Sequence, residues 1–143
     1  MVTVAAALGC GFSSEESRAD ELRAAAKSLI PAKSTLIGEE LGACIEFADE
    51  PSCVVLLFAV EDLPPQEMRV RLGEAVAEAN GWHLTDTTSG SGGTILEFEK
   101  DGFEASLVFW RETSGSCDGE TPRDCGDNVD HVWLTYAGGK SLL

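Results

Sequence analysis

Apolar positions follow a helical period in two segments of the chain and a period of two in most of the others. In the first helical segment they recur at intervals of three or four over residues 19–29, and Pro31 ends the run. Ser13 and Glu16 have the spacing of a capping box at its start. This pattern predicts a helix over residues 14–30.

A second helix is expected after Pro64 and Pro65, because proline is favoured in the first turn of a helix. Asn80 and Gly81 are typical of its C-terminal end. The apolar residues predicted to form its buried stripe are Met68, Leu72, Ala75, Val76 and Ala79.

Six segments are predicted to be strands, and residues 31–40 and 111–129 to be irregular. Cys53–Val60 is apolar on both faces, which is typical of a central strand. Asp101-Gly102 between two alternating runs predicts a hairpin. The predicted strands are Leu41–Phe47, Cys53–Val60, Trp82–Thr88, Thr94–Glu99, Phe103–Trp110 and His131–Tyr136.

The order α-β-β-α-β-β-β-β predicts a two-layer α+β fold. We expect an antiparallel sheet of about five to six strands with both helices on one face. With 143 residues, 43% of them hydrophobic, the chain is long and apolar enough for a single folded domain.

The chain is strongly acidic, with 25 acidic and 10 basic residues and a formal charge of −15. Such a surface repels phosphate backbones and anionic lipid head groups, so nucleic-acid binding and electrostatic adsorption to membranes are not expected. No apolar run reaches the roughly 18 residues that a transmembrane helix needs.

The N-terminal segment ends in a cysteine. An apolar run leads to Ala7-Leu8-Gly9-Cys10, and polar residues follow from Ser13. These four residues resemble the lipobox of cell-envelope lipoproteins from high-GC Gram-positive bacteria, although Ala7 stands where leucine is usual and Leu8 where a small residue is usual. The resemblance implies that residues 1–10 are the remnant of a signal peptide, that residues 11–143 form the domain, and that Cys10 carries lipid.

The count of five cysteines is consistent with this location, because setting Cys10 aside leaves four cysteines, an even number that can pair as disulfides. The other four form two local couples, and each couple flanks a turn-like segment. A hairpin turning at Ala48-Asp49 would place Cys44 directly opposite Cys53. The expected disulfides are Cys44–Cys53 and Cys117–Cys125; the alternative is a reduced cytosolic protein with scattered thiols.

The titratable residues offer few candidate sites. His83 and His131 lie near strand starts beside tryptophans, and would form a metal or acid–base site with Asp86 or Asp130 if their strands were neighbours. Otherwise they are surface residues. The acidic loop from Asp118 to Asp130 has oxygen ligands for calcium but lacks the order of a calcium loop.

No sequence motif indicates catalysis, a cofactor or a bound metal. The stretch Gly90-Ser91-Gly92-Gly93 lies between two predicted strands with no lysine nearby, so it indicates a hairpin rather than a phosphate loop. The serines have no nucleophile-elbow context. Glu97 and Glu99 are expected on a solvent face with ordinary pKa values.

Trp110 and Trp133 are the candidate binding residues. Alternation along the two strands places both on the face opposite the one that the helices are expected to cover. An exposed aromatic patch is typical of a binding surface for a protein, peptide or glycan, and the alternative is burial under the loop 111–129.

The sequence therefore suggests a lipid-anchored or secreted binding module on the extracytoplasmic face of the cell membrane. Two alternatives stay open: a cytosolic immunity-type or regulatory binding protein with free thiols, and a small metal-dependent hydrolase. Membrane contact is expected through the lipid of Cys10 alone.

Overall fold

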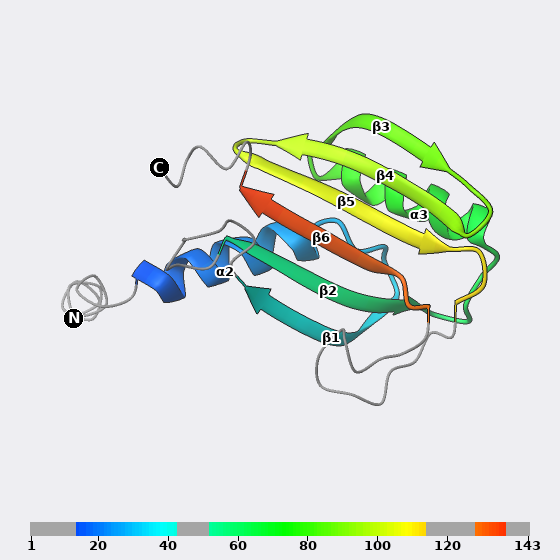
Figure 1. The fold of residues 1–143 in the computed structure, drawn as a ribbon, viewed down its shortest axis with the longest axis horizontal. Coiled ribbons are helices and arrows are strands. Elements are labelled where there is room, and N and C mark those ends of the chain that lie inside the picture. The colour runs from blue at the N-terminus through cyan, green and yellow to red at the C-terminus, as the bar shows by residue number, and fades with distance from the viewer. Residues whose placement is uncertain (1–13, 43–51, 114–127, 137–143) are drawn as a thin grey trace.

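The computed structural model describes residues 14–42, 52–113 and 128–136 (Figure 1). Within them the chain forms two helices and six strands in the predicted order, so the α+β fold is confirmed. The elements are α2 (Ser14–Lys27), β1 (Ser34–Gly42), β2 (Cys53–Val60), α3 (Gln66–Ala79), β3 (His83–Ser89), β4 (Gly93–Lys100), β5 (Phe103–Trp110) and β6 (His131–Tyr136).

The six strands form one open antiparallel sheet in the order β1-β2-β6-β5-β4-β3. Helix α3 carries the chain from β2 to the far edge at β3, and the next three strands return step by step until β6 lies beside β2 (Figure 1). The apolar strand β2 is thus enclosed between two neighbours, as its composition predicts.

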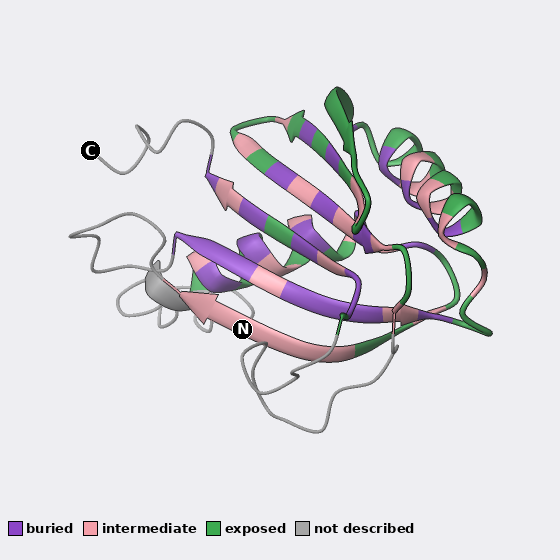
Figure 2. Cartoon of the chain, turned by 45° about the vertical axis from the view of Figure 1, so that its right-hand side comes forward, coloured by how far each residue is buried: buried purple, intermediate pink, exposed green. Residues whose placement is uncertain are grey.

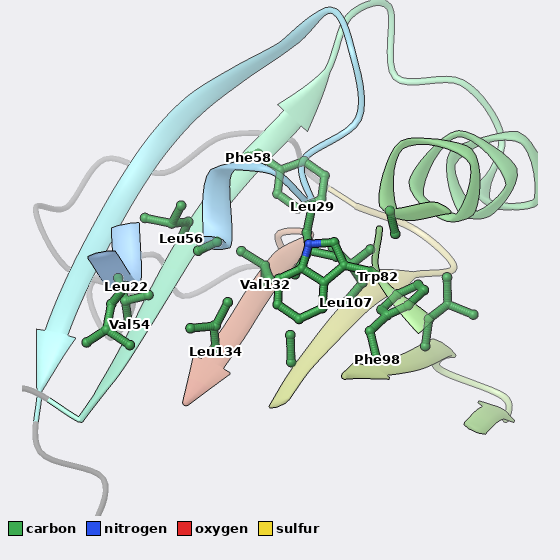
Figure 3. Close-up of a cluster of buried hydrophobic side chains, with 14 of the residues drawn as sticks. Leu22, Leu29, Val54, Leu56, Phe58, Trp82, Phe98, Leu107, Val132 and Leu134 are labelled. Carbon is green, nitrogen blue, oxygen red and sulfur yellow. The ribbon is translucent and has the colours of Figure 1, made fainter. Parts of the chain in front are cut away.

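Both helices cover the same face of the sheet. Helix α2 packs against β2 and β6, whereas α3 packs against β3, β4 and β5. One hydrophobic core joins them, with side chains from both helical segments and from strands β2, β4, β5 and β6 (Figure 3). Burial therefore alternates along β4 and β5, and the residues between the buried ones face away from the helices (Figure 2).

The predicted buried stripe of α3 is wrong by about one position. The buried residues are Arg69, Gly73 and Ala77, whereas Met68 is 54% exposed. Gly73 allows the helix to approach the sheet closely, since a Cβ added there would lie 2.7 Å from Cζ of Phe109. An apolar pattern selects the wrong row here because a glycine and an ion-paired arginine occupy the buried one. Of the predicted stripe, Leu72 and Val76 are half-buried, and Ala75 and Ala79 are exposed.

Strand β1 begins at Ser34, seven residues before the predicted start. Of the residues 31–40 that were predicted to be irregular, 31–33 are irregular and 34–40 belong to the strand. Its register shifts between Leu36 and Gly38, and it lies at the edge of the sheet. Edge strands tolerate bulges and charges, which interrupt the alternation that identifies a strand. One such charge, Glu39, pairs with Arg23 of α2 at 2.7 Å.

Both predicted hairpins, one between β3 and β4 and one between β4 and β5, are present. Asp101 and Gly102 have φ values of 39° and 90°, as the two central residues of a type I′ turn require. Gly90 N–H donates to the Gly93 carbonyl oxygen at 2.9 Å, which closes the β3–β4 turn. Gly90–Gly93 thus connects antiparallel strands and opens no helix, so the hairpin interpretation holds over the phosphate loop. Neither helix in the described ranges has the length and hydrophobicity needed to cross a membrane.

Candidate functional site

The face of the sheet that the helices leave uncovered holds an open trough of about 570 Å³. No described helix lies over it, since both pack on the opposite face. Its floor is made by neighbouring strands β4, β5 and β6, and the edge strand β3 contributes one side. The residues that line this trough are Thr85, Thr88, Ile95, Glu97, Phe98, Glu99, Glu104, Ala105, Ser106, Val108, His131, Trp133 and Thr135.

Trp133 is the exposed large aromatic side chain among the described residues of the trough: it is 47% exposed, whereas Phe98 is buried. It lies in the middle of β6, directly opposite Val55 on one side and Ser106 on the other. Continuing the row, Ser106 is opposite Glu97 of β4. The prediction that Trp133 emerges on the open face is therefore correct.

Trp110 does not join Trp133. It lies at the end of β5, four residues beyond Ser106, which corresponds to roughly 13 Å along the strand. Its side chain is half-buried, lies next to Gly92 and does not line the trough. The expected pair of tryptophans is thus one exposed tryptophan with a second that belongs to a different part of the sheet.

Three carboxylates lie together in the trough. Glu99 is directly opposite Glu104, and Glu97 is two residues away on the same face of β4. All three side chains are exposed, and in the described ranges none forms an ion pair. None of the described residues that line the trough is a lysine or an arginine.

His131 is the other titratable group in the trough. Its Nδ1 lies 3.2 Å from the carbonyl oxygen of Val129, and burial lowers its pKa below the ordinary value for histidine. It is therefore neutral at pH 7, and the three glutamates determine the charge of the trough.

The two histidines do not share a site. His83 lies on β3 and His131 on β6, three strand spacings apart, or about 14 Å across the sheet. A shared zinc ion requires both imidazoles within about 2.1 Å of the metal. The strands are not neighbours, so the condition for a two-histidine site is not met. Within the described residues no group of three or more His, Cys, Asp or Glu side chains is placed to hold a metal ion.

No family model, curated protein or solved structure matches this chain. The function is therefore inferred from the chemistry of the trough and of the residues around it.

A buried ion pair that the sequence did not indicate lies at one end of the sheet. Arg69 and Asp130 are 2% and 1% exposed, and their side chains are joined by a hydrogen bond from Nη1 to Oδ2. Burial raises the pKa of Asp130, and the hydrogen bond from Arg69 opposes that shift. Asp130 is thus neither a calcium ligand nor a partner for His83; the rest of the acidic loop, 118–127, lies outside the described residues.

Cys53 is the cysteine that the structure describes, and Cys10, Cys44, Cys117 and Cys125 lie outside the described residues. The residue opposite Cys53 is Gly42, whose carbonyl oxygen lies 3.4 Å from the sulfur of Cys53. Direct opposition of Cys44 and Cys53 is therefore wrong by two residues. The turn at Ala48-Asp49 on which it depended also lies outside the described ranges.

The carboxylate cluster was missed, although one sequence signal defines it. A two-residue turn at Asp101-Gly102 sets the pairing of the strands on both sides, and this pairing places Glu104 opposite Glu99. The turn and the solvent face of Glu97 and Glu99 were both predicted from the sequence, but the residue opposite each of them was not.

Proposed function

We propose that this chain is an extracytoplasmic interaction module, lipid-anchored through Cys10 or secreted, that binds a partner through the trough around Trp133. The observation that carries the proposal is the 47% exposure of Trp133 in the middle of the uncovered sheet face. Tryptophan is enriched among the residues that dominate binding energy at protein interfaces. The trough around Trp133 also contains apolar Val108 and Ile95 and several polar side chains, as in a mixed binding surface.

The location follows from Cys10 and from the cysteine count. We propose that four cysteines are paired as Cys44–Cys53 and Cys117–Cys125. Gly42 is paired with Cys53 across the ladder, and Cys44 follows Gly42 by two residues in the sequence, which supports a local pairing of the two cysteines. Each disulfide would close a short loop and stabilise the domain by about 2.5–3 kcal/mol.

Thiol alkylation followed by intact-mass measurement tests the proposed extracytoplasmic location and the lipid anchor. The gene with its own upstream region is expressed in a host that exports and lipidates proteins, and the membrane fraction is alkylated without reductant. We expect no alkylated cysteine and a mass increase that corresponds to acyl chains, because Cys10 is lipidated and the others are paired. A Cys10→Ser variant should leave the membrane fraction. Five alkylated cysteines would instead indicate the cytosolic alternative.

Site-specific photo-crosslinking tests the binding surface. A photoreactive phenylalanine derivative replaces Trp133 in one variant and Met68 in the control, and both are produced in cells. Met68 is similarly exposed but lies on α3, on the helical layer. We expect an adduct of defined mass from position 133 and none from position 68. Equal labelling from both positions, or none from 133, would contradict a binding role for the trough.

A further inference from the structure

Resting on the function proposed above, we infer that the partner segment that occupies the trough is cationic: a short peptide stretch with lysine or arginine side chains. The inference depends on three features of the uncovered face: its uncompensated carboxylates, its exposed indole, and its size.

The three carboxylates of the trough differ from those carboxylates of the described residues that an arginine neutralises. Elsewhere Arg23 contacts Glu39, Arg71 contacts Glu67, and Arg69 contacts Asp130. In the trough, by contrast, Glu99 and Glu104 face each other directly, and among the described residues no lysine or arginine pairs with either of them. Directly opposite residues on one face have Cβ atoms about 5 Å apart, and like charges at this position are destabilising. A cationic side chain placed between them would remove that repulsion.

Trp133 provides the second half of the recognition. It is diagonal to Glu104 on the neighbouring strand, because its direct partner there is Ser106. A diagonal pair is separated by roughly 7–8 Å, which the stem of a lysine or arginine spans. The methylene stem can pack on the indole while the charged end reaches the carboxylate, and a cation over tryptophan is itself favourable.

The charge also excludes other occupants. A second copy of the chain would place the same three glutamates against each other, so self-association through this face is disfavoured. Anionic ligands are repelled by the trough and by the net charge of −15. A neutral glycan fits the indole but gains nothing from the charge of the glutamates.

The volume sets the scale of the contact. About 570 Å³ lies within the range of pockets that hold small ligands, roughly 300–1,000 Å³. The trough therefore accommodates a few side chains of an extended segment. Strands β4 and β5 run along the trough. On β4, Glu97 and Glu99 face it, and their partners on β5 are Ser106 and Glu104.

The test uses tetralysine with blocked ends as the probe, and tetraglutamate and a neutral tetrasaccharide for comparison. Binding to the intact chain is measured by titration calorimetry and by tryptophan fluorescence. One triple variant carries Glu97→Gln, Glu99→Gln and Glu104→Gln. The control triple carries Glu61→Gln, Glu78→Gln and Glu112→Gln, which are exposed residues outside the trough. Both triples change the net charge equally, so their difference isolates position from total charge.

We expect saturable binding of tetralysine that weakens as salt is raised. The trough triple should weaken it at least about tenfold and the control triple less than about twofold. Trp133→Ala should weaken it several-fold. The trough triple should melt at or above the temperature of the parent, since it removes like-charge repulsion, so loss of binding will not reflect unfolding.

Three outcomes overturn the inference. If the two triple variants lose affinity for tetralysine equally, binding depends on the overall charge of the chain. If the parent chain shows no saturable binding, the trough does not bind cationic peptides. Binding of the tetrasaccharide that requires Trp133 but not the glutamates identifies a glycan site instead. In that case the proposed binding role of the trough survives, whereas it fails separately if crosslinking from position 133 yields no adduct.

Discussion

Replacing Asp130 by alanine is expected to lower the free energy of unfolding by about 3–5 kcal/mol, because it leaves the Arg69 guanidinium buried without its counter-charge. Arg69 is held on three sides: Nε donates to the Pro64 carbonyl oxygen at 2.8 Å, Nη2 to the Trp110 carbonyl oxygen at 2.7 Å, and Nη1 to Asp130. Asp130 also accepts from the Trp110 N–H at 3.0 Å. The pair thus links the start of α3 to the end of β5 and the start of β6.

Denaturant unfolding followed by tryptophan fluorescence measures the loss. The control is Glu67→Ala, which removes an exposed ion pair with Arg71 and should cost about 0.5 kcal/mol or less. Adding Arg69→Met to the Asp130→Ala variant should recover part of the loss, since it removes the uncompensated charge. A loss of less than about 1 kcal/mol for Asp130→Ala would show that water reaches Arg69 and that the ion pair is not shielded from solvent.

The pairing of β3, β4 and β5 could be predicted from the sequence because its signals are local. Asp101-Gly102 determines one turn, and Gly90–Gly93 allows the other. Apolar residues alternate along β5 with a period of two. A two-residue turn also determines which residues of the two strands face each other. The opposition of Glu99 and Glu104 was therefore available from the sequence.

Features that depend on distant parts of the chain could not be predicted. Arg69 and Asp130 are 61 residues apart, and nothing local indicates that they meet. The start of β1 is hidden because an edge strand tolerates Glu39 and Glu40. Alternation gives the face of a tryptophan but not its position along the sheet. For that reason Trp110 and Trp133 were placed on one face correctly, but not at their true separation.

Replacing Phe109 by alanine is expected to lower the free energy of unfolding by about 3–5 kcal/mol. The ring is fully buried and meets Phe58 edge-on, with ring centres 6.0 Å apart. It also faces Gly73 of α3, where an added Cβ would lie 2.7 Å from Cζ and 3.0 Å from Cε2 of the ring. Removal of the ring therefore leaves a cavity between the helix and the sheet. Denaturant unfolding measures the loss.

The same contact predicts how Gly73→Ala behaves in two backgrounds. In the parent chain it should cost about 1–3 kcal/mol, because the new methyl group overlaps the Phe109 ring. In the Phe109→Ala background the methyl group enters the vacated space, and alanine is favoured over glycine in a helix by about 1 kcal/mol. There the substitution should become neutral or stabilising. Gly90→Ala, where an added Cβ meets nothing within 4 Å, is the control and should behave alike in both backgrounds. If Gly73→Ala costs the same with and without the ring, the close approach of α3 to Phe109 is not the reason for glycine at this position.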